Sequence, residues 1–269
     1  MDISRRMALA IGAAFVARPA LGIETPGVGI PYLEELGRPG ALPDGMAFVP
    51  PSRVDLAYSH VIYINAALSG PGAQKMWVIE RAPSGTASGW KLALHDPELW
   101  ADATPEYSWP VSTGRYYQGD NRSGPTPLGV FNVDDRGYRH VRGWGAPGMY
   151  NSIFIDLHYS GGRISGVAMH GTTQSKYSLL GRPDSHGCIR MEQPNADAIW
   201  SMFHGDGTPG EGSPLWSAAV PRYFTSEPEQ NWNTRWNYTR DGSFLYDASG
   251  ERLTKPGYSA LFVIFRDDL

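Results

Sequence analysis

The stretch HGTTQSKYSLLGRPDSHGCIR, residues 170–190, contains the single cysteine of a 269-residue chain. His170 ends a predicted strand, and Cys188 lies on the predicted turn into a helix. Gly187 permits a close backbone bend before the thiol, so that N–H groups there can converge on a developing oxyanion. The intervening loop is long enough to return the chain beside the strand and bring the imidazole near the sulfur. The stretch therefore predicts a nucleophilic thiol with a histidine base.

Two other interpretations of the cysteine stay open on its local chemistry alone. Free cysteine is among the most buried residue types, so an inert packed thiol is a common alternative. The other is a zinc site, whose ligands would be His158, His170, His186 and Cys188. These residues lack the C-x-x-C or H-x-x-x-H spacing of zinc sites, so metal binding is the weaker interpretation. A single cysteine also has no resolving partner in the chain, which argues against dithiol redox chemistry.

Composition predicts a soluble globular protein rather than a disordered one, with 41% hydrophobic and 19% charged residues. The 32 glycines, 22 prolines and 12% aromatic residues predict many turns and short strands, hence a β-rich fold. The formal net charge is -4, and no cluster of lysine and arginine offsets it locally. Nucleic acid is therefore not an expected partner.

The N-terminus has the layout of an export signal. Arg5 and Arg6 precede an apolar run over 7–17, and residues 20–22 form a small-x-small cleavage site. The segment SRRMAL also loosely resembles a twin-arginine signal. The apolar run is shorter than the ~20 residues of a membrane span, and no later segment is long and apolar enough. We expect residues 1–22 to be removed after export to the periplasm; a retained N-terminal anchor is the alternative.

Apolar periodicity predicts several strands and one clear helix. The strands are expected as a hairpin of 59–68 and 74–81, then at 90–95, 129–133, 151–159, 163–171 and 260–265, with a second hairpin over 243–253. The helix begins at Pro194, ends at Gly205, and is indicated by the apolar positions Ala196, Ile199, Trp200 and Phe203. Residues 96–103 are expected to form at most a helical turn, and 134–150 a surface excursion.

Four ordered motifs resemble the L,D-transpeptidase catalytic domain family, also called YkuD-like. H-G-T at 170–172 and SHGCIR at 185–190 are similar to the signature of that family, at a spacing within its range. Upstream, VSTGR (111–115) and PTPLGVF (125–131) resemble its V-S-T-G and T-P-x-G-x-F segments in the same order. The resemblance implies a mainly β fold, a mixed β-sandwich with a short helix after the cysteine. The C-terminal β-rich extension has no counterpart in the family pattern and is expected from the strands predicted there.

The resemblance covers roughly residues 56–210, and with the other sequence features it divides the chain into four expected parts. These are an export signal (1–22), a linker or wrapping segment (23–55), the catalytic domain (56–210) and an extension packed on that domain (211–269). The aromatic side chains of the extension could stack on sugar rings, but we favour packing because large aromatics are mostly buried. They are Trp216, Trp232, Trp236, Tyr238 and Tyr246.

By the same resemblance, Cys188 would be the nucleophile and His170 its general base, with the carbonyl of Gly171 orienting the imidazole. The N–H groups of Gly187 and Cys188 would form part of an oxyanion hole. No metal or organic cofactor is implied.

Three further residues of the signature receive roles around the thiol. Ser185 and His186 would shape the pocket and form hydrogen bonds in it. Arg190 would either fix the loop near the thiol or hold a substrate carboxylate, two tasks that arginine serves equally well. Some family members have asparagine at the position of Arg190.

The implied reaction is acyl transfer on peptidoglycan stem tetrapeptides, the expected partners of the protein. The thiol would attack the carbonyl of an L-configured residue, terminal D-alanine would leave, and an amine of a neighbouring stem would resolve the thioester into a 3-3 crosslink. With water as acceptor the same site would make an L,D-carboxypeptidase or endopeptidase. An inactive cell-wall binding protein is the third alternative, against which the presence of His170, Gly187 and Cys188 argues.

Overall fold

The computed structural model describes residues 29–83, 89–94, 108–145, 148–159, 163–223, 239–241 and 244–268. The predicted export signal and the predicted turn at 96–103 lie outside these residues, as do Trp232, Trp236 and Tyr238. Within the described residues, no helix is both long and apolar enough to cross a membrane.

A six-stranded sheet forms the middle of the molecule. Its strands are β1 (His60–Asn65), β2 (Lys75–Arg81), β3 (Trp90–Leu92), β4 (Trp109–Pro110), β5 (Gly129–Asn132) and β16 (Ala260–Phe265). Five of them follow the order β3-β2-β1-β16-β5, and β4 pairs with β2. The predicted hairpin of β1 and β2 is confirmed. The last strand, β16, is parallel to β1 and antiparallel to β5, so the end of the chain lies inside this sheet.

A second sheet has four strands in the order β11-β10-β7-β6. They are β6 (Val141–Gly145), β7 (Met149–Phe154), β10 (Ala168–Gly171) and β11 (Ile189–Met191). Strands β10 and β11 are parallel, whereas β7 is antiparallel to both of its neighbours.

This sheet corrects three expectations. The surface excursion at 134–150 is wrong in part, because a 3-10 turn (Gly137–Arg139) leads into strand β6. Cys188 does not enter the helix directly, because β11 intervenes. The strands expected over 151–159 and 163–171 are each broken, with the short pair β8 (His158–Tyr159) and β9 (Arg163–Ile164) between β7 and β10.

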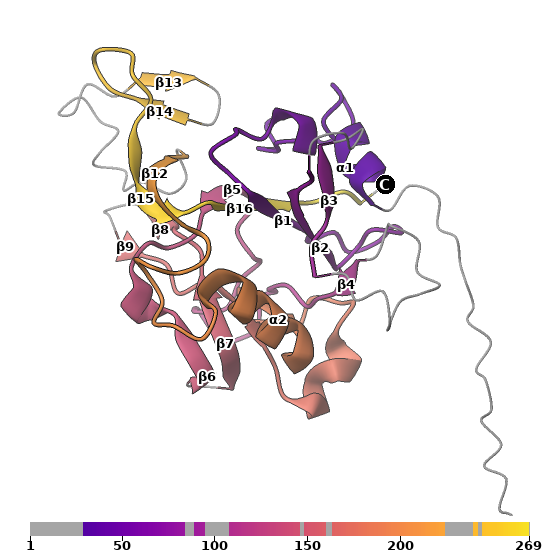
Figure 1. Cartoon of the computed structure of the whole chain (residues 1–269). Helices are drawn as coiled ribbons and strands as arrows, with labels where there is room; N and C mark the ends of the chain where they lie inside the picture. The colour runs from indigo at the N-terminus through magenta and orange to yellow at the C-terminus, as the bar shows by residue number, and fades with distance from the viewer. Residues whose placement is uncertain are drawn as a thin grey trace, which may run out of the picture.

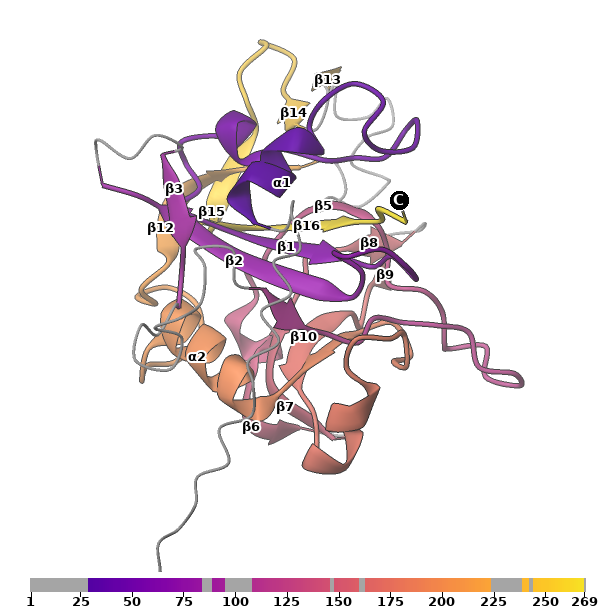
Figure 2. The same ribbon diagram turned by 90° about the vertical axis from the view of Figure 1, so that its right-hand side faces the viewer.

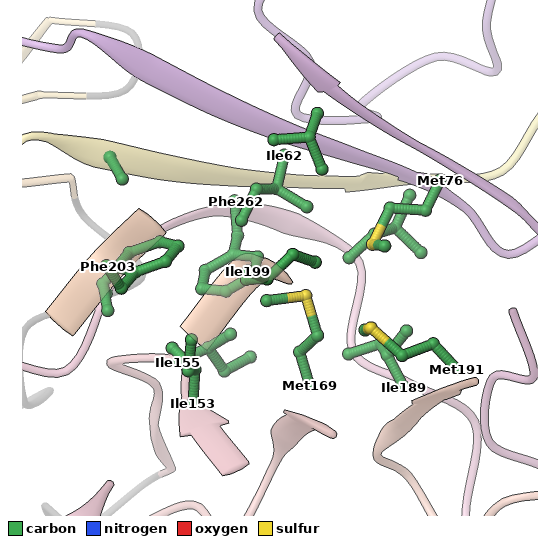
Figure 3. Packing of buried hydrophobic residues seen from close by; sticks show 14 of the residues in the cluster. Ile62, Met76, Ile153, Ile155, Met169, Ile189, Met191, Ile199, Phe203 and Phe262 are labelled. Atoms are coloured by element: carbon green, nitrogen blue, oxygen red, sulfur yellow. The ribbon is translucent and has the colours of Figure 1, made fainter. Parts of the chain in front are cut away.

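The main hydrophobic core fills the space between the two sheets and α2 (Gln193–His204), as Figure 3 shows. The core includes alternate residues of the six-stranded sheet, such as Ile62 and Phe262, and Met169 and Ile189 of the second sheet. The predicted helix is confirmed, and the four predicted apolar positions are its buried face together with His204. It ends at Gly205, whose φ of 57° lies in the left-handed region that glycine tolerates.

A second hydrophobic cluster covers the opposite face of the six-stranded sheet. The remaining alternate residues of β1 and β16, including Val61 and Leu261, pack there against Leu33 of α1 (Ile30–Glu35) and Tyr223. Figures 1 and 2 show α1 on this side of the sheet and α2 on the other. The middle sheet is therefore apolar on both faces, as its nearly continuous apolar strands require.

The C-terminal segment before β16 is fixed to the core at several points. Arg222, which follows β12 (Trp216–Pro221), forms a buried ion pair with Asp156. Strand β15 (Thr254–Tyr258) pairs with β12, and β13 (Thr239–Asp241) with β14 (Phe244–Tyr246). The predicted second hairpin is confirmed by the bridge between Tyr246 and Arg252. Trp216 packs against the main core, in an edge contact with Tyr258, as expected for a packing role.

A matched pair of leucine substitutions measures how much the last strand contributes to stability. Leu261 in β16 is 0% exposed and Leu56 is 88% exposed. We expect Leu261→Ala to lower the free energy of unfolding by about 2–5 kcal/mol, because it leaves a cavity. Leu56→Ala should change it by less than about 0.5 kcal/mol. Urea denaturation followed by tryptophan fluorescence measures both, and equal effects would contradict the central position of β16.

Candidate active site

Strand alternation places the candidate residues on one face of the four-stranded sheet. Met169 and Ile189 are cross-strand partners and point into the core. The next pair in register, His170 and Arg190, therefore points to the opposite face. Cys188 comes two positions before Arg190, at the entrance to β11.

A pocket of about 320 Å³ opens on this face. It brings together the predicted residues His170, Ser185, His186, Cys188 and Arg190. Residues without a predicted role complete the lining: Gly148, Met149, Thr172, Thr173 and Lys176. Gly171 and Gly187 are not part of the lining, although they adjoin His170 and Cys188 in the chain.

The ring of His170 is held in one tautomer. Its Nδ1 lies 2.9 Å from the carbonyl oxygen of Gly171, and a carbonyl can only accept, so Nδ1 carries the proton. Burial lowers the pKa of His170 to about 4; the bond to Gly171 opposes this shift, and the charge of Arg190 adds to it. At neutral pH the imidazole is thus uncharged, and its Nε2 is a hydrogen-bond acceptor.

The thiol of Cys188 is half-buried and has a weak backbone contact, with Sγ 3.6 Å from the carbonyl oxygen of Gly166. Burial raises the pKa of Cys188 above its ordinary value, although a backbone hydrogen bond with Ala168 and the charge of Arg190 act in the opposite direction. At neutral pH the resting site therefore holds a neutral thiol and a neutral imidazole, not an ion pair.

Ser185 organises the turn before the cysteine. Its Oγ donates to the carbonyl oxygen of Cys188 and accepts from the N–H of Gly187 at 3.1 Å. Gly187 has a φ of 140°, which side chains rarely adopt, so a glycine is required at this point. The Gly187 N–H, one of the two predicted oxyanion donors, is therefore already bound to Ser185.

The backbone of the 111–114 segment lies directly against this turn. A Cβ built on Gly114 would lie 2.6 Å from Cα of Gly187 and 2.2 Å from the carbonyl oxygen of Gly124, so no side chain fits. Thr126 joins the two segments, because its hydroxyl accepts from the N–H of Gly114 at 2.8 Å and donates to the carbonyl of Gly187 at 2.9 Å. The two upstream motifs thus position the cysteine turn, a role that sequence reasoning did not assign to them.

Arg190 is tied to the loop on which the turn begins. Its Nη1 donates to the carbonyl of Asp184 and lies 3.4 Å from the Asp184 carboxylate. The same carboxylate accepts from Arg115 at 3.1 Å, and Tyr117 donates to the same carbonyl at 2.7 Å. These contacts favour the loop-fixing interpretation of Arg190. Asp184 is the residue missed by sequence reasoning, because no local pattern marks a residue whose carboxylate and carbonyl together accept from three side chains.

His186 forms an outer wall of the pocket. Its ring stacks on Tyr117 with 4.5 Å between centroids, and its Nε2 is 3.3 Å from the carboxylate of Asp120. The zinc interpretation gains no support, since His158 contacts Asp156 instead. In the described part of the chain, no three His, Cys, Asp or Glu side chains are grouped so as to hold a metal ion.

Residues 93–211 match the family model YkuD, described as the L,D-transpeptidase catalytic domain, which is the family that the sequence motifs resemble. The predicted mainly β fold, with a short helix after the cysteine, is confirmed. No curated protein sequence matches the chain.

Several solved structures are similar to the chain over about half its length. One is an L,D-transpeptidase from Mycobacterium tuberculosis H37Rv, with 17% identity and a TM-score of 0.32, covering 56% of this chain and 55% of that one. Another is an L,D-transpeptidase from Mycobacterium smegmatis, with 17% identity, a TM-score of 0.29 and 56% of both chains covered. A third, from Xylanimonas cellulosilytica, has 16% identity, a TM-score of 0.28 and coverages of 56% and 57%.

The neutral resting pair predicts a distinctive pH dependence for the thiol. We expect alkylation of Cys188 by iodoacetamide to be slow near neutral pH and to rise as the pH passes the ordinary thiol value of 9.0, because burial raises the thiol pKa. The rate is measured by mass spectrometry of the intact protein. A flat, fast rate between about pH 5 and 8 would indicate a thiolate–imidazolium pair and contradict this assignment.

A pair of substitutions at Thr126 tests the link between the two segments. We expect Thr126→Val to lower the free energy of unfolding by about 1–3 kcal/mol, because it leaves the N–H of Gly114 and the carbonyl of Gly187 without their buried partner. Thr126→Ser keeps the hydroxyl and should lose less. The comparison is made by urea denaturation, and a loss in Thr126→Val no larger than that in Thr126→Ser would contradict the role of the hydroxyl.

Proposed function

We propose that the protein is an exported L,D-transpeptidase that acts on peptidoglycan stem tetrapeptides through a thioester on Cys188. The observation that carries the proposal is the presence, in one pocket, of a thiol and a neutral imidazole whose proton is on Nδ1, which leaves Nε2 as the proton acceptor. The family match over 93–211 supports the choice of reaction. An exported protein reaches the cell wall, where this substrate lies.

In the first step, Sγ of Cys188 attacks the carbonyl carbon of the L-configured third residue. The S–C bond forms while the thiol proton moves to Nε2 of His170, and the carbonyl of Gly171 stabilises the imidazolium through Nδ1–H. Because both groups are neutral at rest, proton transfer accompanies the attack rather than preceding it. The C–N bond to D-alanine then breaks, and His170 gives the proton to the leaving amine.

In the second step, an amine of a neighbouring stem attacks the thioester. His170 takes a proton from this amine, the S–C bond breaks, and the thiol is regenerated as the proton returns to sulfur. The product is a 3-3 crosslink. Water in place of the amine gives a tripeptide, which is the carboxypeptidase outcome of the same acyl-enzyme.

The oxyanion of each tetrahedral intermediate needs a donor. We assign this role to the N–H of Cys188, since the N–H of Gly187 is bound to Ser185. Ser185 is then a positioning residue: by holding both ends of the turn it fixes the direction of the Cys188 N–H. A catalytically inactive wall-binding protein would need neither this turn nor a histidine held in one tautomer.

Product analysis with defined tetrapeptide muropeptides tests the proposal. We expect the wild-type protein to release D-alanine and form crosslinked dimers, and Cys188→Ala to form no product because no thioester can arise. His170→Gln should slow the reaction by about 100-fold or more, since general base catalysis contributes at least that much.

The controls separate chemistry from folding. Thermal unfolding of Cys188→Ala should match that of the wild-type protein, and a carbapenem should add its mass to the wild-type thiol only. Tripeptide without dimers would assign the enzyme to hydrolysis. Unchanged product formation by Cys188→Ala would overturn the thioester mechanism.

A further inference from the structure

The pocket around Cys188 is basic although the chain as a whole is acidic. Its lining contains Lys176 and Arg190 but no aspartate or glutamate, whereas the formal net charge of the chain is -4. His170 adds no charge, because burial keeps its pKa near 4. A site that concentrates positive charge against the overall balance favours an anionic ligand.

The two cations of the pocket are not equivalent. Arg190 donates to the carbonyl of Asp184 and lies beside its carboxylate, so its charge is compensated inside the protein. Lys176 is exposed on the rim of the pocket. Across the described ranges, no carboxylate lies within 4.0 Å of its ammonium group. Lys176 therefore supplies the uncompensated charge of the pocket.

The segment that carries Lys176 is held in place by two hydrogen bonds, both made by residues that follow the lysine. Lys176 lies in η4 (Gln174–Leu179), the 3-10 segment between β10 and the cysteine turn. The hydroxyl of Tyr177 accepts from the N–H of Gln193 at 2.9 Å, at the start of α2. The N–H of Gly181 donates to the carbonyl of Val111 at 2.8 Å. These bonds fix the backbone on which the lysine extends over the pocket.

We propose that Lys176 is a specificity-determining residue that binds a free carboxylate of the acyl-donor peptide. This inference rests on the proposed function and names a chemical requirement of its donor. An ammonium–carboxylate contact is a charge-assisted hydrogen bond, which a carboxamide cannot reproduce. Two carboxylates share this chemistry: one on a donor side chain, and the terminal carboxylate of the leaving residue.

An ammonium–carboxylate contact takes no part in the bonds that form and break, so it binds the ground state and the transition state alike. Its loss should therefore raise KM and leave kcat nearly unchanged. A rise in KM without a fall in kcat distinguishes the loss of this contact from general damage to the pocket, which would lower kcat. The exposure of Lys176 also means that salt should weaken the contact.

The test compares three donors: the tetrapeptide with both carboxylates free, the same peptide with the side-chain carboxylate amidated, and the same peptide with the terminal carboxylate amidated. For the wild-type protein we expect KM to rise about tenfold on amidation at the recognised position. In Lys176→Gln, KM for the free acid should rise by about the same factor and the preference should disappear. Lys176→Arg should keep the preference for the free acid, because arginine retains the positive charge.

The matched control is Arg53→Gln, which removes one positive charge at an exposed position of η1 (Pro51–Arg53). It should leave KM and the acid preference unchanged. Equal KM values for acid and amide donors in the wild-type protein, or an acid preference that survives in Lys176→Gln, would overturn the role of Lys176 while the transferase function stands.

Binding measurements keep the two proposals separate. Cys188→Ala and the double variant with Lys176→Gln can be titrated calorimetrically with the same three peptides. If the wild-type protein turns over none of them, the proposed function fails, and the role of Lys176 in it fails as well. An acid preference in Cys188→Ala that the double variant loses supports the carboxylate contact, and its persistence in both proteins contradicts that contact.

Discussion

The site depends on one close approach of two backbones, at Gly114 and Gly187. Neither position tolerates a side chain. A Cβ on Gly114 would clash with the backbone of Gly187, and Gly187 has a φ of 140°, which residues with side chains rarely adopt. The hydroxyl of Thr126 links the two backbones, because it accepts from the N–H of Gly114 and donates to the carbonyl of Gly187. Backbone packed at this distance cannot slide without losing buried hydrogen bonds, so the position of Cys188 is set by main chain rather than by its own side chain.

That contact also joins the two sheets. At one end of the 109–114 segment, β4 pairs with β2, and the N–H of Val111 donates to the carbonyl of Gln74 at 2.9 Å. Further along the segment, Ser112 bridges to Arg190 in β11. The middle sheet is in turn completed by β16 from the end of the chain. The stability of the candidate site is therefore coupled to strands that contribute no side chain to it.

Elements that depend on local apolar periodicity can be predicted from the sequence, whereas the positions of strands that pair with distant segments cannot. The helix after the cysteine, the first hairpin and the strand at 260–265 follow from apolar periodicity, and the structure contains them. The position of β16 between β1 and β5 depends on a partner far away in the chain, which periodicity does not identify. Strand β6 is not predicted from the sequence, because its glycines and exposed side chains lack the alternation of apolar and polar residues that marks a strand. The contacts of Asp184 and the proposed role of Lys176 are not predicted for a related reason, because both arise only where separate loops meet.

Burial links the chemistry of the site to this packing. It lowers the pKa of His170 and raises that of Cys188, so both changes favour the uncharged forms. A resting thiolate would be the stronger nucleophile, but it would need a compensating charge, and the guanidinium of Arg190 is already engaged by Asp184. In the proposed reaction a neutral pair develops charge only while substrate covers the pocket, where the carbonyl of Gly171 would stabilise the imidazolium and the N–H of Cys188 the oxyanion. The tight backbone contact at Gly114 is thus the condition under which an uncharged thiol can serve as the proposed nucleophile.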